Sequence, residues 1–225
     1  ALEEAGLLEG RRPIAPTLTP WQWGLLRLLL GREARRVRQT TAPLLWAREI
    51  VFASPMDHFL HAPNAPLDRV RDRILARVDP APTGVKRLYL SRRGDDKRRM
   101  VNEAELEAAL EARGFTVVLT GSMDVARQVA LFRDAEVVVA PTGAALANCV
   151  FCRRGTKVFE IQPENFTGIW ARAVCHFAGV DWHGWFAASP LEESDFVVEG
   201  VPRPNVLFAW RTPLAEFLGF LDERL

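Results

Sequence analysis

The chain of 225 residues has few cysteines, no long apolar run and almost no net charge, and each of these absences excludes a class of protein. Three cysteines, an odd and low number, argue against a disulfide framework and fit a reducing compartment. A formal net charge of +1 gives no support for nucleic acid as a partner. A membrane-spanning helix needs about 20 apolar residues, and the best run, 25–30, is interrupted by Arg27.

The start of the chain shows no pattern of a signal peptide. Together with the cysteine count, this leads us to expect a protein of the cytoplasm, or one held peripherally at the inner face of the membrane, without a transmembrane segment. A homo-oligomer stays open, because nothing in the sequence decides the number of subunits.

Two regions of different pattern meet near residue 82, where a Pro- and Gly-containing linker lies. Residues 1–82 are rich in proline and arginine. There we expect a helix over 20–30, capped by Thr19, a strand over 49–53 and a helix over 67–78. Residues 83–225 alternate instead between short apolar runs and helical patterns.

The second region predicts a parallel sheet covered by helices. Its strands are almost wholly apolar, which is typical of strands that are buried on both faces. The expected strands are 86–90, 115–119, 136–140, 157–161 and 180–187, and the expected helices are 102–113, 124–132, 144–151, 169–178 and 207–225 or its later part from Pro213. We therefore expect an α/β fold with a Rossmann-like parallel sheet, preceded by a smaller N-terminal part.

A loop of small residues, Thr142-Gly143-Ala144-Ala145, follows the valine-rich strand and leads into a helix that contains Asn148. Small residues let a ligand approach the backbone, and the first amide groups of a helix favour an anion. In open parallel sheets, ligands bind at the carboxyl ends of strands. Tight packing of the helix on the sheet explains the small residues equally well.

A basic segment follows the first strand of the sheet, from Ser91 and Arg92 to Arg98 and Arg99. Arginine suits phosphate because its planar guanidinium donates two parallel hydrogen bonds and keeps its charge. A solvated basic loop is the alternative, but the place at the carboxyl end of a strand favours binding. Asn102 begins the next helix, where it either binds a ligand or forms a capping box with Glu105.

These residues resemble a motif of glycosyltransferase family 61, Ser-Arg, then Arg, then Asn-Glu, which Ser91-Arg92, Arg98 or Arg99, and Asn102-Glu103 match here. The segment from Gly143 to Phe151 and the run Val158 to Pro163 also match in order and spacing. The resemblance covers residues 86–163 well and residues 16–74 more weakly.

The resemblance implies a GT-B-like enzyme with two Rossmann-like domains facing a cleft. Such an enzyme transfers a sugar from a nucleotide donor, here expected to be UDP-linked, to a hydroxyl of a glycan or another acceptor, with inversion and without a metal or other cofactor. The substrate-binding residues that we expect are Ser91, Arg92, Arg98, Arg99, Asn102, Thr142, Gly143, Ala144, Ala145, Asn148 and Glu160, the last as a partner for a ribose.

Two departures from the family pattern concern catalysis. Members of the family carry His-Gly-Ala-Gly where this chain has Thr142-Gly143-Ala144-Ala145, so a histidine and a glycine are replaced. The region before residue 83 is also short for an acceptor domain, which suggests an incomplete one. Candidates for the base that activates the acceptor are Asp57, His58 and His61, which are also ordinary residues for a proline-rich surface loop.

Other clusters have simpler interpretations. Cys149 and Cys152 form one isolated Cys-x-x-Cys pair, which is weak evidence for zinc or redox chemistry even with Cys175, His176 and His183 in the chain. Buried apolar cysteines explain them better. The alternative to the transferase is a non-catalytic nucleotide-binding or regulatory module on the same fold. A nicotinamide or flavin enzyme is disfavoured, because the first strand leads into Ser-Arg-Arg and not into a glycine fingerprint.

Overall fold

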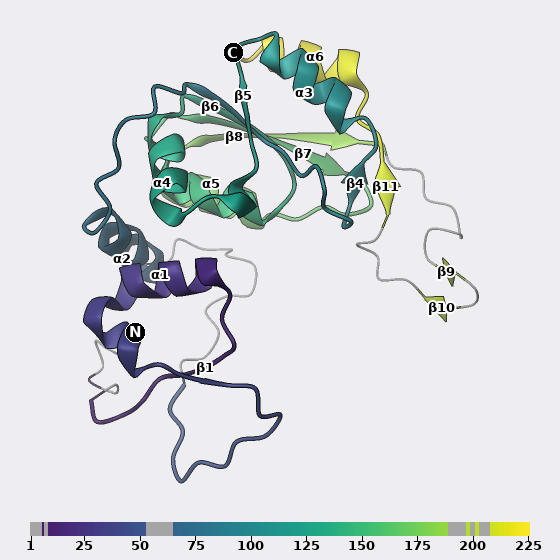
Figure 1. Ribbon diagram of the computed structural model, residues 1–225. Coiled ribbons are helices and arrows are strands. Elements are labelled where there is room, and N and C mark those ends of the chain that lie inside the picture. The colour runs from purple at the N-terminus through teal and green to yellow at the C-terminus, as the bar shows by residue number, and fades with distance from the viewer. Residues whose placement is uncertain (1–5, 7–8, 53–64, 189–196, 199–200, 203–207) are drawn as a thin grey trace.

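A parallel sheet of five strands forms the centre of the protein (Figure 1). The structure is a computed structural model and describes residues 6, 9–52, 65–188, 197–198, 201–202 and 208–225. The strand order is β5 (Thr116–Val118), β3 (Arg87–Leu90), β6 (Val137–Pro141), β7 (Lys157–Pro163) and β8 (Asp181–Ala187), and every pair is parallel. The expected Rossmann-like α/β fold is confirmed.

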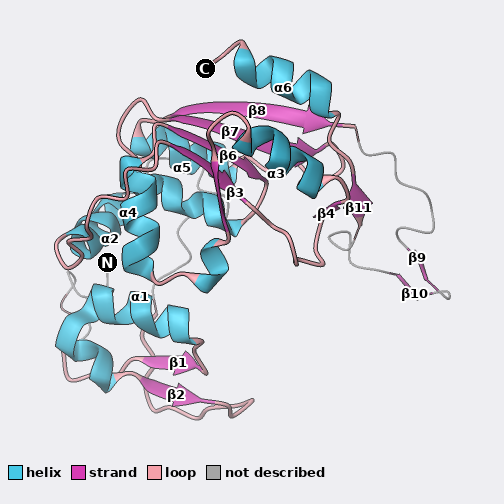
Figure 2. Ribbon diagram, turned by 45° about the horizontal axis from the view of Figure 1, so that its top comes forward, coloured by secondary structure: helices cyan, strands magenta, loops and turns pink. Residues whose placement is uncertain are grey.

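Helices cover both faces of this sheet (Figures 1 and 2). One face packs on α4 (Val125–Asp134), the 3-10 helix η3 (Ala144–Phe151) and α5 (Trp170–Ala178). The other packs on α3 (Glu103–Glu111) and α6 (Leu214–Asp222). Side chains alternate along the strands, so that Val138 faces the first core and Val139 the second. This two-sided burial is why the strands are apolar along their length.

The order of the strands in the sheet differs from their order in the chain. This difference determines where a ligand can bind. From β3 the chain passes to β5 on one side and then returns to β6 on the other side of β3. The crossover connections leave the sheet in opposite directions at this point and open a crevice outside the carboxyl ends of β3 and β6.

The N-terminal part is built from short elements beside this sheet. They are β1 (Ile14–Pro16), α1 (Pro20–Leu30), the 3-10 helix η1 (Gly31–Arg36), β2 (Arg38–Thr40) and α2 (Ala65–Leu75). Leu25, Leu28 and Leu29 of α1 pack against the core on the α4 side of the sheet. Arg77 strengthens this contact, since its Nη1 donates to the carbonyl oxygen of Leu29 at 3.0 Å. The proposed domain boundary at residue 82 and the GT-B-like pairing of two domains stay predictions.

Most expected elements agree with the structure to within two residues at each end. The helix over 20–30 is α1 with the same bounds, and Gln22 Oε1 accepts from the backbone N–H of Thr19 at 2.8 Å. The helix over 67–78 is α2, which ends three residues earlier than predicted. Asp124 caps α4, since its side chain accepts from the backbone N–H of Arg127.

Two local predictions were wrong, and two others agree with the structure only in part. Residues 49–52 form no strand, because Ile50 and Phe52 are exposed and no strand lies beside them among the described residues, while residue 53 lies outside those residues. The helix over 144–151 is a 3-10 helix, with Leu146 N bonded to Gly143 O. At the C-terminal end the shorter alternative from Pro213 is confirmed, although α6 ends at Asp222, before the end of the chain. The side chain of Asn102 makes no hydrogen bond to the first turn of α3, so no capping box forms with Glu105.

Two short strand pairs were not predicted. β4 (Arg99–Met100) pairs in parallel with β11 (Ala209–Trp210), and β9 (Val197–Val198) pairs antiparallel with β10 (Val201–Pro202). The first pair places β11, which precedes α6, beside the segment that follows β3.

Candidate functional site

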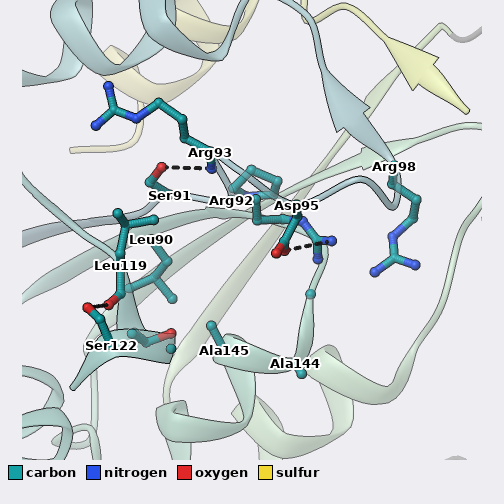
Figure 3. A pocket seen from close by; sticks show the side chains of 14 residues that line it. Leu90, Ser91, Arg92, Arg93, Asp95, Arg98, Leu119, Ser122, Ala144 and Ala145 are labelled. Carbon is teal, nitrogen blue, oxygen red and sulfur yellow. Dashed lines mark hydrogen bonds and ion pairs between the residues drawn. The ribbon is translucent and has the colours of Figure 1, made fainter. Parts of the chain in front are cut away.

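A cavity of about 480 Å3 lies at the crevice between β3 and β6 (Figure 3). The carboxyl ends of three neighbouring strands and the loops that follow them line it: Leu90, Ser91, Arg92, Arg93, Asp95 and Arg98 at β3, Leu119, Thr120, Gly121 and Ser122 at β5, and Pro141, Gly143, Ala144 and Ala145 at β6. The place is the one that the fold makes available for a ligand.

Arg92 connects the first and third of these loops. Its Nη1 donates to the carbonyl oxygen of Thr142 at 3.0 Å, and its Nη2 donates to that of Lys97 at 2.9 Å. Asp95 forms an ion pair with the same Nη2 at 3.1 Å but is itself largely exposed to solvent. The third nitrogen, Nε, is buried and has no partner among the described residues. The guanidinium is therefore fixed in position while its Nε–H stays unused.

Gly143 makes room for this guanidinium. Its φ of 177° is extended backbone that any residue adopts, so the glycine is not needed for its backbone conformation. A Cβ atom at residue 143 would instead overlap Arg92 Nη1. The glycine of this loop thus serves the approach of Arg92 to the backbone.

Arg98 brings a second guanidinium to the cavity. Its Cζ lies 4.4 Å from the centre of the Phe166 ring, and its Nε is buried without a partner among the described residues. Burial, followed by the positive charge of Arg92, lowers the pKa of Arg98. The backbone of Arg98 has a φ of 52°, an uncommon conformation for a residue with a side chain. The two positively charged guanidinium groups therefore repel each other. An anion between them would remove this repulsion.

A buried carboxylate supports the loop from below. Glu103 Oε1 accepts hydrogen bonds from the backbone N–H of Arg92 at 2.7 Å and from Tyr89 Oη at 3.0 Å. Burial raises the pKa of Glu103 in spite of these two bonds. Arg93 forms an ion pair with buried Glu107, which lies one helical turn further along. In the sequence, Glu103 matches the Asn-Glu part of the family motif and is a favourable charge at the start of a helix, but neither observation indicates these hydrogen bonds.

The structure brings together most of the expected substrate-binding residues. Those that line the cavity are Ser91, Arg92, Arg98, Gly143, Ala144 and Ala145. Thr142 adjoins it, with a buried side chain and a carbonyl that holds Arg92. Of the two alternative arginines, only Arg98 lines the cavity, since Arg99 belongs to the exposed start of β4.

Three expected residues lie elsewhere and use their polar atoms within the protein. Asn102 Nδ2 donates to the carbonyl oxygen of Thr212 at 2.8 Å, and Asn102 Oδ1 accepts from the backbone N–H of Thr212 at 3.0 Å. Asn148 donates to Gln128 Oε1 at 2.8 Å. Fully buried Glu160 accepts from Trp182 Nε1 at 2.9 Å.

The carboxylate of Glu160 is only half satisfied. No side chain among the described residues makes a hydrogen bond of good geometry to its Oε1, and burial raises its pKa although Trp182, Gln162 and Thr142 act in the opposite direction. This group does not reach the cavity, so its role as a ribose partner stays a prediction without support from the geometry.

The loop after β5, from Leu119 to Ser122, was missed by sequence reasoning. The signal was present, because the same rule that selected the loops after β3 and β6 applies to every strand of a parallel sheet. Nothing in its residue types, a leucine, two hydroxyl residues and a glycine, indicated binding.

The remaining candidates are settled in part. Cys149 and Cys175 are buried in the apolar core, as the simpler interpretation predicted, and Cys152 is half-buried. Within the described ranges, no group of three or more His, Cys, Asp or Glu is placed to hold a metal ion. Asp57, His58 and His61 lie outside the residues that the structure describes.

Comparison with known proteins shows which family the chain is similar to. The family model described as Glycosyltransferase 61 matches residues 14–159, which is more than half of the chain and includes all three loops of the cavity. No curated protein matches the chain. Among the helices that the structure describes, none is long and apolar enough to cross a membrane.

Proposed function

The chain belongs to glycosyltransferase family 61, and on this premise we propose that it transfers a sugar from a UDP-linked donor to a hydroxyl of a glycan or another acceptor, in polysaccharide or glycan synthesis. The cavity between β3 and β6 binds the diphosphate of the donor. The part of the cavity lined by Leu119 to Ser122 receives the nucleoside.

One observation supports the placement of the diphosphate above others. Arg92 and Arg98 approach the same cavity, and each has a buried Nε without a partner among the described residues. Buried donors that lack partners are costly, and a charged donor more so. An anion with several acceptor oxygens satisfies both and cancels the repulsion between the two guanidinium groups.

The same arginines give the site its part in catalysis. Negative charge grows on the diphosphate as the bond to the sugar breaks, and fixed positive charges that are already in place stabilise that state more than the ground state. In this proposal the arginines neutralise the leaving group, so the reaction proceeds without a metal. The acceptor hydroxyl attacks the opposite face of the sugar, which gives inversion.

The rest of the predicted organisation follows from this placement. Residues 83–225 form the donor-binding domain, and residues 1–82 belong to the acceptor side of a GT-B-like cleft. The base that removes the proton of the acceptor hydroxyl is sought among Asp57, His58 and His61. The enzyme works in the cytoplasm or peripherally at the inner face of the membrane.

Calorimetric titration with UDP and with UDP-sugars tests the donor site. We expect binding by the full chain and a loss of roughly tenfold or more in affinity for Arg92→Ala, because a hydrogen bond to a charged group contributes about 1.5–3 kcal/mol. If the wild-type chain binds neither UDP nor any UDP-sugar, the proposal fails.

The replacement of the family histidine by Thr142, whose side chain is buried, favours a second candidate, a nucleotide-binding module without transferase activity. This candidate predicts that UDP-sugars bind but that no UDP is released in the presence of acceptors. It also predicts that restoring the family pattern by Thr142→His with Ala145→Gly gives no turnover. Release of UDP by the wild-type chain rules it out.

A further inference from the structure

A stretch of nine residues in the N-terminal part exposes its large apolar side chains. Within 44–52 these are Leu44, Leu45, Trp46, Ile50 and Phe52, and Trp46, Ile50 and Phe52 are exposed by 89%, 71% and 75%. We name residues 44–52 the apolar segment. Single exposed apolar residues are ordinary, whereas a contiguous group marks a surface that another apolar phase covers.

The apolar segment lies away from the donor cavity. In Figure 1 residues 41–52, which follow β2 and are drawn in blue, extend beyond β1 and away from the five-stranded sheet. Arg11 contacts the segment through an ion pair with Glu49, and Arg36 donates to the carbonyl oxygen of Arg11 at 2.9 Å. Arginine side chains therefore accompany the apolar ones on this part of the protein.

The charge of the same region is strongly positive. Residues 9–52 contain eight arginines, no lysine and three glutamates, a net charge of +5, whereas the whole chain has +1. The rest of the chain therefore has −4. The guanidinium groups of Arg32 and Arg35 have no hydrogen bond or ion pair in the part of the chain that the structure describes, and with Trp23 and Arg27 they line a cavity of about 430 Å3 on α1 and η1.

We propose that residues 9–52 bind the surface of a membrane that contains anionic phospholipids, with the side chains of the apolar segment inserted among the acyl chains and the arginines at the phosphate groups. Tryptophan is enriched at the interface between membrane and water. Basic residues near a bilayer are attracted by its negative surface potential. The segment thereby lies on the bilayer without crossing it.

The positive charge of residues 9–52 favours a membrane over a second copy of the chain as the partner of the apolar segment. Two copies meeting symmetrically through the apolar segment would bring two regions of +5 together, which is unfavourable. A membrane with anionic lipids instead supplies the opposite charge and an apolar phase at the same surface. The inference gives a structural basis to the peripheral location proposed above but does not depend on transferase activity, since it concerns other residues than the donor cavity.

Sedimentation with vesicles tests the proposal. The full chain is mixed with vesicles of phosphatidylcholine alone, or of equal parts of phosphatidylcholine and phosphatidylglycerol. We expect binding to the mixed vesicles, at least about tenfold weaker binding to phosphatidylcholine alone, and a decline of the former with added salt.

Pairs of substitutions separate the contribution of the apolar side chains from that of the arginines. Trp46→Ser with Ile50→Ser lowers the partition coefficient on mixed vesicles by roughly tenfold or more, because two large apolar side chains are lost. Arg32→Gln with Arg35→Gln lowers it by roughly thirtyfold, from about 1 kcal/mol for each charge. The matched controls, Ile169→Ser with Phe186→Ser and Arg153→Gln with Arg154→Gln, change exposed residues near α5 and η3 and leave binding unchanged.

A measurement on the wild-type chain keeps the test valid even if a variant fails to fold. Vesicles of brominated lipids quench the fluorescence of tryptophans that enter the bilayer, so we expect quenching in the wild-type chain and its loss in Trp46→Phe, which still binds. The proposal is overturned if the wild type does not bind mixed vesicles, or if the test and control pairs bind alike. It is equally overturned if the wild type is a dimer that Trp46→Ser with Ile50→Ser turns into a monomer, since a second copy then covers the segment.

Discussion

The guanidinium of Arg92 lies across Gly143, so close that a side chain at residue 143 would occupy the same space. The two residues are 51 positions apart, at the ends of the two strands between which the chain reverses its direction across the sheet. Their contact, completed by the bond from Arg92 Nη1 to the carbonyl oxygen of Thr142, joins the two loops into one anion site.

Replacing Gly143 by alanine should damage this site without a change of charge. The added methyl group displaces Arg92, and we expect a loss of roughly tenfold or more in affinity for UDP and a loss of about 1–3 kcal/mol in the free energy of unfolding. Calorimetry and urea denaturation measure the two effects. Gly219→Ala in α6 is the control, because nothing lies within 4 Å of a Cβ there. It should leave the affinity for UDP unchanged and change the free energy of unfolding by no more than about 1 kcal/mol.

The two adjacent arginines should respond differently. Arg98 lines the cavity and Arg99 does not, so Arg98→Gln should lower the affinity for UDP by roughly tenfold to a hundredfold, whereas Arg99→Gln should change it by less than about twofold. Parallel titrations decide the point. Equal losses in both variants, or a larger one for Arg99, would mean that the family motif uses the other arginine.

Asn102 should contribute to stability and not to binding. Asn102→Ala leaves the N–H and the carbonyl of buried Thr212 without partners, which costs about 2–4 kcal/mol in the free energy of unfolding. The affinity for UDP should stay within about twofold of wild type. The same truncation at half-buried Asn148 is the comparison and should cost about 1 kcal/mol. A stable Asn102→Ala variant with weakened UDP binding would restore Asn102 to the ligand site.

The buried carboxylate of Glu160 should make the stability of the protein depend on pH. Because its folded-state pKa is raised above the ordinary value of about 4.5, its contribution to stability declines as the pH rises from that value through the raised pKa. Glu160→Gln lacks this decline. Urea denaturation of both proteins over a series of pH values isolates the effect of Glu160 from that of Glu103. A wild type that gains stability relative to the variant as the pH rises would contradict the assignment.

The sheet was predictable because two-sided burial makes its strands almost wholly apolar, as in 136–140, and the helices between them keep their own pattern. The loops at the ends of β3 and β6 followed from the same topology. The 3-10 form of η3 was not predictable, because apolar spacing in an eight-residue segment does not distinguish i+3 from i+4 bonding.

Contacts between distant residues escaped prediction for another reason. Asn102 was read as a helix cap or a ligand contact, but its amide is used by Thr212, which lies 110 positions further along the chain. Likewise Glu103 supports Arg92 only because β3 places Tyr89 and Arg92 beside the start of α3. The strand predicted at 49–53 failed because β-propensity does not supply a neighbouring strand.

In the proposed donor site, Arg92 and Arg98 bind the diphosphate of the donor. Comparing the affinities for UDP and UMP in the wild type and in Arg92→Gln with Arg98→Gln tests this binding. We predict that the wild type prefers UDP to UMP by roughly tenfold or more and that the double variant binds both alike. The same preference for UDP in both proteins would contradict the account, because the second phosphate would then be recognised elsewhere.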